Sequence, residues 1–80
     1  MPVYFFDIQD GDEFIEDEVG LECETYATVR KAAIAALPDM AQAVMPDSDH
    51  HAITVTVRDE AGSRIFTASL TLNAQWSDSN

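Results

Sequence analysis

Residues 25–45, TYATVRKAAIAALPDMAQAVM, constrain the fold most strongly, because no other segment is long and periodic enough to predict a helix. Its apolar residues recur at intervals of three and four positions, which places them on one face of an α-helix. They are Tyr26, Val29, Ala33, Leu37, Met40, Ala41, Val44 and Met45. This face needs a second layer to cover it, and the remaining segments, which have the short patterns of strands, must supply that layer.

The start and the interior of this helix carry two further signals. Thr25 is expected to cap the N-terminus, because its hydroxyl can accept a hydrogen bond from an unpaired amide of the first turn. Pro38 lacks the amide proton that a helical hydrogen bond requires, and a proline within a helix costs about 3 kcal/mol. We therefore expect either a kink near Leu37 or a split into two helices over residues 26–37 and 39–45.

A first hairpin is predicted before the helix. The run VYFFDI at residues 3–8 is rich in the aromatic and β-branched side chains that favour strands. The Asp-Gly dipeptide at residues 10–11 is typical of a tight turn. A weaker strand follows at residues 14–15, with a continuation over residues 19–23 as an alternative, and Gly20 marks a bulge or turn in it.

A second hairpin is predicted after the helix. Residues 52–59 and 64–74 alternate apolar and polar side chains, and residues 60–63 form the turn between them. The order ββαββ predicts an α+β two-layer sandwich in which one helix packs on a four-stranded, mainly antiparallel sheet. We expect a single domain over residues 1–80, with residues 75–80 as a flexible C-terminal tail.

The charge of the chain excludes some partners. Fifteen Asp and Glu against four Lys and Arg give a formal charge of −11. Nucleic acids and anionic membranes are bound through Lys and Arg, so we expect neither as a direct partner. An acidic patch is predicted near the N-terminus, at Asp10, Asp12, Glu13, Glu16, Asp17 and Glu18. An alternative function follows, that of an acidic regulator, antitoxin-like or mimicking nucleic acid, which binds a basic protein surface.

No metal site is predicted. No frame of residues 7–22 has the ligand spacing of a helix-loop-helix calcium site. His50 and His51 lie in a polar stretch with Asp47 and Asp49, but adjacent histidines point in different directions, so we interpret the stretch as a solvated loop. We expect no cofactor, no specific metal and no catalytic residue, and therefore a protein that is not an enzyme.

Asp7 and Asp17 are expected to hold turns in place by accepting backbone amide bonds, Asp7 at the turn around Gly11 and Asp17 near Gly20. No nucleophile or basic residue lies near them in the sequence, which argues against catalysis. Cys23 has no disulfide partner and no neighbouring His or Lys, so it is predicted to be an inert, partly buried hydrophobe. A single cysteine suits a reducing compartment.

A cytoplasmic location is predicted. The N-terminal residues lack the basic and long apolar regions of a signal peptide, and no run approaches the roughly 18 apolar residues of a membrane span.

The first strand carries apolar side chains on both faces, whereas a sheet covered by one helix needs only one apolar face. Val3 and Phe5 should face away from the helix, and Ile65 is expected to join them among the hydroxyl groups of the last two strands. Either the tail folds back so that Trp76 packs on Phe5, or a partner protein covers this face. The candidate interaction residues are Val3, Phe5, Ile65 and Trp76. The first hypothesis for the function is therefore a protein-interaction module that binds a protein partner or forms a homodimer through the open sheet face, with Trp76 as an anchor.

The segments YFFDI at residues 4–8, DG at 10–11 and DEVGLE at 17–22, followed by a helix and by VTVRDEAGSRIF and SLTL, resemble a family of short bacterial proteins. The family is known from alphaproteobacterial, especially rhizobial, genomes as a domain of unknown function. The similarity covers nearly the whole chain, and its most specific part is the N-terminal pattern. Members often carry an uninterrupted helix rich in Ala, Arg and Leu, from which Pro38 departs. The resemblance implies no activity.

Overall fold

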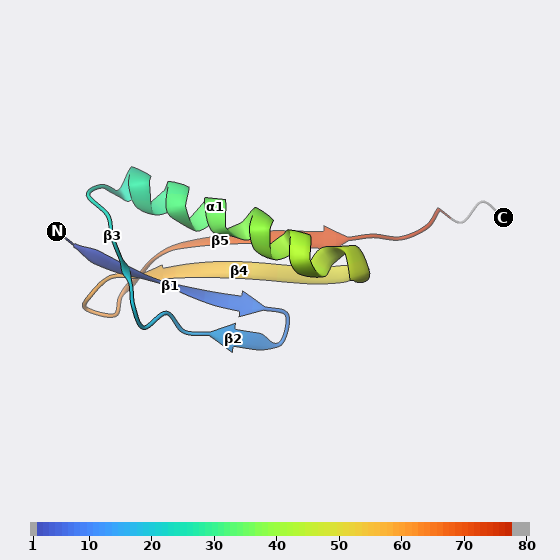
Figure 1. The fold of residues 1–80 in the computed structure, drawn as a ribbon, viewed down its shortest axis with the longest axis horizontal. Helices are drawn as coiled ribbons and strands as arrows, with labels where there is room; N and C mark the ends of the chain where they lie inside the picture. Colours follow the sequence, from blue (N-terminus) through green and yellow to red (C-terminus); the bar gives the residue numbers. More distant parts are fainter. Residues whose placement is uncertain (1, 78–80) are drawn as a thin grey trace.

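A computed structural model describes residues 2–77, and within them one helix packs on one face of an antiparallel sheet of five strands (Figure 1). The elements are β1 (Val3–Asp10), β2 (Glu13–Ile15), β3 (Leu21–Glu22), α1 (Tyr26–Val44), the 3₁₀ turn η1 (Met45–Asp47), β4 (His50–Arg58) and β5 (Arg64–Asn73). The predicted α+β two-layer class is confirmed. The predicted count of four strands is wrong, because the continuation beyond Gly20 pairs as a separate short strand.

The sheet has the order β2-β1-β4-β5, and β3 also pairs with β1. β2 pairs with the C-terminal end of β1, where Ile8 lies opposite Ile15, and β3 pairs with its N-terminal end, where Val3 lies opposite Glu22. The loop of residues 16–20 interrupts what would otherwise be one strand beside β1. β4 pairs with β1 as well as with β5, so the two predicted hairpins join through their first strands.

The helix begins as predicted, because the Thr25 hydroxyl accepts a hydrogen bond from the amide of Thr28 at 3.1 Å. It continues through Pro38 to Val44, so the alternative of two separate helices is wrong. Pro38 lies on the exposed side of the helix, whereas Leu37 and Ala41 are buried on the other side. Packing of these apolar residues on both sides of the proline outweighs the lost hydrogen bond. Within the described residues, no helix is long and apolar enough to cross a lipid bilayer.

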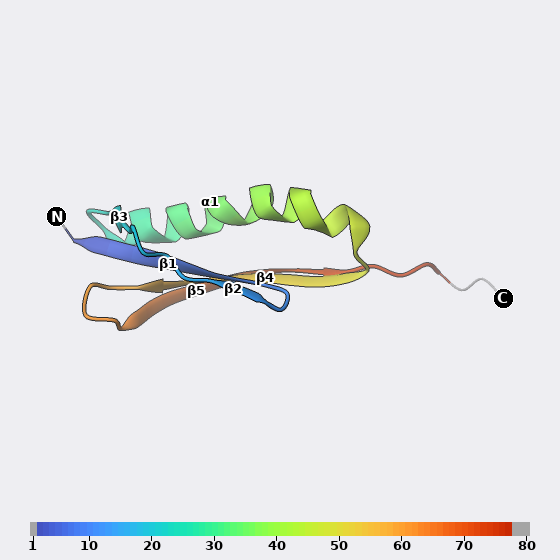
Figure 2. The same ribbon diagram turned by 60° about the horizontal axis from the view of Figure 1, so that its bottom comes forward.

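The core lies between α1 and the face of β1 and β4 that it covers (Figure 2). Its buried residues are Tyr4, Cys23, Val29, Ala33, Leu37, Ala41, Ile53, Val55 and Val57. Alternate residues along β4 therefore face the helix, as the sequence predicted. Cys23 is fully buried in this core, where the sequence predicted partial burial.

The second hairpin differs from the prediction at its ends and at one bulge. β4 begins at His50, two residues earlier than expected. Val57 pairs with Phe66 but Arg58 pairs with Arg64, so Ile65 is an extra residue in β5. A bulge of this kind changes the direction of the side chain at the extra residue. Of the predicted flexible tail, residues 78–80 lie outside the described residues.

Candidate functional site

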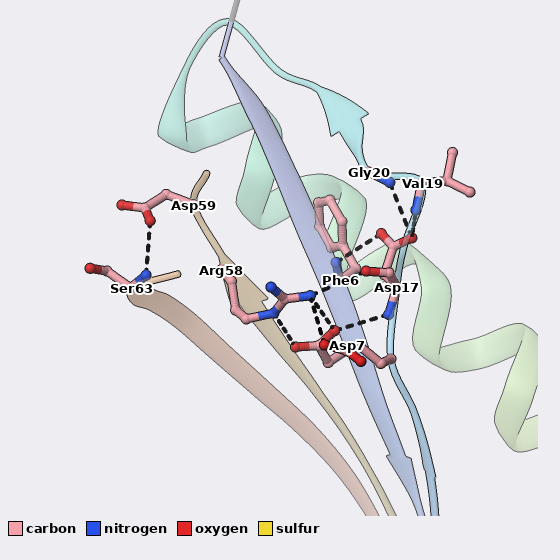
Figure 3. Close-up of polar contacts among 9 residues, drawn as sticks. Phe6, Asp7, Asp17, Val19, Gly20, Arg58, Asp59 and Ser63 are labelled. Atoms are coloured by element: carbon pink, nitrogen blue, oxygen red, sulfur yellow. Dashed lines mark hydrogen bonds and ion pairs between the residues drawn. The ribbon is translucent and has the colours of Figure 1, made fainter. Parts of the chain in front are cut away.

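Three charged residues meet on the sheet face that α1 does not cover (Figure 3). Arg58 of β4 donates from Nε to Oδ2 of Asp7 at 2.5 Å and from Nη2 to Oδ1 of Asp7 at 3.1 Å. The same Nη2 donates to the backbone carbonyl of Asp17 at 3.1 Å. Asp7, in β1, is 6% exposed and is therefore a buried carboxylate with a bidentate partner. This cluster connects β1, β4 and the loop of residues 16–20.

The Asp17 carboxylate organises the loop around it. Oδ2 accepts from the amide of Phe6 at 3.0 Å, and Oδ1 accepts from the amides of Val19 and Gly20 at 3.0 and 3.1 Å. The Asp17 amide in turn donates to Oδ1 of Asp7 at 3.0 Å. The prediction that Asp17 holds the backbone near Gly20 is confirmed.

The corresponding prediction for Asp7 is wrong. The Gly11 amide donates to the carbonyl of Ala52, and Asp7 bonds Arg58 and Asp17 instead. Sequence reasoning found no basic partner for Asp7, because Arg58 is 51 positions away along the chain. Only the pairing of β1 with β4 brings the two together.

These contacts shift the pKa values of the cluster. The hydrogen bonds from Arg58 hold the pKa of Asp7 below its usual range, and the same contact raises the pKa of Arg58. Burial alone would raise the pKa of Asp17, but the amide bonds from Phe6, Gly20 and Val19 outweigh it and lower the pKa. Both carboxylates are therefore charged at neutral pH. All four carboxylate oxygens of Asp7 and Asp17 accept hydrogen bonds from the protein itself, so the arrangement is that of a fold-stabilising network.

The apolar residues Val3 and Phe5 on the open face are partly covered by the chain itself. Gly20 has a φ of +81°, and a Cβ atom there would lie 2.5 Å from Cγ1 of Val3 and 3.0 Å from Cε1 of Phe5. Cζ of Arg58 lies 5.0 Å from the centre of the Phe5 ring, a cation–π arrangement. The loop of residues 16–20 and Arg58 therefore supply part of the cover that the sequence assigned to a tail or a partner. The role of Val3 and Phe5 in binding stays a prediction.

Ile65 and Trp76 do not join that face. Ile65 packs against the helix-side core because of the bulge, so the prediction that it lies on the open face is wrong. Trp76 is 96% exposed, so the alternative in which it packs on Phe5 is also wrong. It borders a hollow of about 400 Å³ together with Met45 and Leu72, at the end of the sheet where β5 terminates.

Some carboxylates of the acidic patch bind other groups of the chain, and the others are exposed to solvent. Asp10 pairs with His51, and Asp17 is occupied by backbone amides. Glu16 lies 3.8 Å from Nη2 of Arg58, a distance at which an exposed pair contributes little. The exposed members of the patch are Asp12, Glu13, Glu16 and Glu18.

The two histidines lie in β4 and not in the predicted loop. His50 contacts the side chain of Asn73 at 3.1 Å, and His51 contacts Asp10. They therefore point in different directions, as the sequence indicated. Among residues 2–77, no group of three or more His, Cys, Asp and Glu side chains is placed to hold a metal ion.

The strand β5 has a free edge, a feature that sequence reasoning missed. β5 is the last strand of the sheet order and pairs only with β4 in the described part of the chain. Its ten residues, RIFTASLTLN, contain no proline, and Arg64 is their only charged residue. Natural edge strands are usually protected by charges, proline or short length. The absence of these protections was visible in the sequence, but the position of the strand at the edge was not.

Apolar side chains line this edge on the helix side. Tyr26, Ala27, Val29, Arg30, Ile65 and Phe66 surround a hollow of about 300 Å³. Ile34 lies four residues after Arg30 and seven after Ala27, hence on the same side of α1. It is 38% exposed, and Leu70 of β5 is 37% exposed. We call the free edge of β5 with Tyr26, Ile34, Phe66 and Leu70 the β5 edge strip.

Comparison with known proteins gives one match. A family model described as a domain of unknown function (DUF6894) matches residues 3–71. No curated protein and no solved structure matches the chain significantly. The resemblance predicted from the sequence is thus confirmed as far as a domain-of-unknown-function family.

Proposed function

The chain belongs to the DUF6894 family, and from its surface we propose that it is a protein-interaction module, and not an enzyme, that docks partners on the β5 edge strip. The observation that carries this proposal is the free, nearly uncharged edge of β5. Such an edge presents a row of backbone N–H and C=O groups to which a further strand can be added. A chain that stayed alone would expose these groups and invite aggregation.

The charge distribution supports the same surface. Arg30 and Arg64 are the charged residues beside the strip, and no Asp or Glu occurs within β5. The acidic patch instead lies in and around β2, a strand of three residues that forms the opposite edge of the sheet. Since the chain carries a formal charge of −11, a surface without carboxylates is one where a partner that is not basic can approach without repulsion.

The open sheet face has weaker support as the docking surface. Gly20 and Arg58 already contact Val3 and Phe5 there, and Ile65 faces the other way. Trp76 remains a candidate anchor, because it is exposed just beyond the end of β5.

The test is site-specific photo-crosslinking in cells that make the protein. A photoreactive amino acid at Leu70 lies on the β5 edge strip, and one at Thr54 lies on the open face of the internal strand β4. We expect a specific crosslinked product from position 70 and none from position 54. A product from position 54 alone would move the docking surface to the open face, and no product from either position would contradict an interaction role.

The second candidate function, an acidic regulator of a basic protein surface, is supported by the four exposed carboxylates of the acidic patch, Asp12, Glu13, Glu16 and Glu18. A crosslinker at position 19, next to this patch, tests it in the same cells. Replacing the four carboxylates by their amides should abolish the product if the binding is electrostatic. A product of unchanged yield would refute this function.

A further inference from the structure

We propose that the partner at the β5 edge strip is a second copy of this chain, whose β5 pairs antiparallel with the first about a two-fold axis at Ser69. The inference rests on the proposed interaction function and names its partner. It makes one continuous sheet from two copies, with both helices on the same side.

The sequence of β5 is self-complementary in this register. A two-fold axis perpendicular to the sheet pairs residues that are equally distant from Ser69 and keeps each on its own face. On the helix face, Phe66 then lies opposite Leu72 and Ala68 opposite Leu70. On the open face, Thr67 lies opposite Thr71 and Ser69 opposite its own copy. These four pairs are apolar with apolar or hydroxyl with hydroxyl, which are favourable combinations, and Ile65 lies opposite Asn73 at each end of the paired segment.

The faces of these residues follow from the pairing of β4 with β5. Phe66 and Leu70 lie opposite Val57 and Ile53, which are buried beneath α1. Ser69 lies opposite Thr54 on the open face, and their hydroxyl oxygens are 2.9 Å apart. The two sets of β5 side chains are thus already sorted by polarity in a single copy.

The charge distribution allows a second copy to approach at this edge. Two chains that each carry a formal charge of −11 repel one another wherever their carboxylates face. In the Ser69 register the paired segment, residues 65–73, contains no charged residue. Arg64 falls beyond it at each end, so the two arginines lie far apart.

Burial favours the same arrangement. Leu70 is 37% exposed in one copy, and pairing brings it next to Ala68 of the partner. The helices would flank the new strand pair, so Ile34, 38% exposed, would approach the junction as well. A nine-residue strand pair with these flanks is at the small end of stable interfaces, so we expect a dissociation constant on the order of micromolar.

The experiment measures the mass in solution by light scattering over a range of protein concentrations. The wild-type chain, 8.8 kDa, should approach twice that mass as the concentration rises. Ser69→Lys and Ser69→Glu should each be monomeric at the same concentrations, because each places identical charges directly opposite one another. An equimolar mixture of the two variants should recover the dimer, since Lys then lies opposite Glu.

The matched control is Thr54→Lys. It removes the same hydroxyl contact and adds the same charge to the same face, but on the internal strand β4. It should dimerise like the wild type. Loss of the dimer in both Ser69→Lys and Thr54→Lys would instead indicate face-to-face packing. Failure of the Ser69→Lys and Ser69→Glu mixture to dimerise would rule out the axis at Ser69. Either result overturns the proposal.

Hydrogen exchange gives a test that needs no variant. Amides of β5 that point away from β4 should exchange faster on dilution, whereas those of β4 should not. A wild-type chain that stays monomeric, with exchange independent of concentration, would overturn self-pairing. A photo-crosslink from position 70 to a protein of another mass would still leave the interaction function standing, so the two proposals can fail separately.

Discussion

Asp17→Ala tests whether one carboxylate holds the loop of residues 16–20 against the sheet. The substitution removes the acceptor for three backbone amides, those of Phe6, Val19 and Gly20. Water can replace the exposed bond to Val19, but the bonds to Phe6 and Gly20 are partly buried. A hydrogen bond to a charged group contributes about 1.5 kcal/mol at the low end, so the two partly buried bonds give a loss of about 3 kcal/mol.

Such a loss is large for a domain of this size. Native stability is roughly 0.05–0.15 kcal/mol per residue, so the variant would retain only part of it. In thermal unfolding, each 1 kcal/mol lowers the Tm of a small domain by about 4–8 °C, which predicts a decrease of roughly 12–24 °C. Circular dichroism during heating, and urea titration for the free energy of unfolding, measure the two quantities.

The matched control is Glu18→Ala, at the next position. Glu18 is an exposed carboxylate, so its loss removes the same charge from a strongly acidic chain. Removing one negative charge should by itself relieve repulsion slightly, and a surface substitution usually changes stability by less than about 0.5 kcal/mol. If Asp17→Ala and Glu18→Ala unfold at the same temperature, the amide bonds of Asp17 do not stabilise the fold and our interpretation of the network is wrong.

Three further substitutions test other parts of the structure. The folded-state pKa of Asp7 is lowered, so its contribution to stability is complete above its unfolded value of about 4 and is lost as the pH falls through the folded value. Asp7→Asn should therefore be less stable at pH 7 by about 2–3 kcal/mol, because Arg58 loses its charged partner. In urea titrations at lower pH, the difference in unfolding free energy between this variant and the wild type should shrink. Gly20→Ala should destabilise the fold by at least about 1–2 kcal/mol, because the φ of Gly20 is positive and the new Cβ would lie 2.5 Å from Val3. An unchanged free energy of unfolding in the same assay would mean that the loop moves away freely. Pro38→Ala should raise the Tm, with a gain of up to about 3 kcal/mol, because Pro38 is exposed within a continuous helix; an unchanged or lower Tm would contradict this.

The elements that the sequence predicted well are those whose signals are local. The alternation along β4 identified its buried face, and the Thr25 hydroxyl identified the start of α1, because a strand period and a helix cap depend on neighbouring residues. The proline penalty is also local, but it is a small fraction of the burial free energy of the helix. The alternative of a split at Pro38 is wrong because Leu37 and Ala41 pack on the sheet on either side of it.

The predictions that failed depended on contacts between distant segments. No pattern near Asp7 indicates Arg58, because their contact exists only once β1 and β4 pair. The direction of Ile65 depends on a one-residue bulge, which reverses the face expected from strict alternation. The free edge of β5 depends on the strand order, which the sequence of a mixed α+β chain does not specify.

The partial cover of the open face makes the edge of the sheet the better candidate for a binding surface. The apolar side chains of Val3 and Phe5 predict an external cover, yet Gly20 and Arg58 supply part of it. The Asp17 bonds hold that cover in place at one edge of β1, where the loop of residues 16–20 also satisfies part of the backbone. β5 has no such loop on its outer side within the described residues. The edge that lacks both a covering loop and repelling charges is therefore the part of this sheet that gains most from a partner.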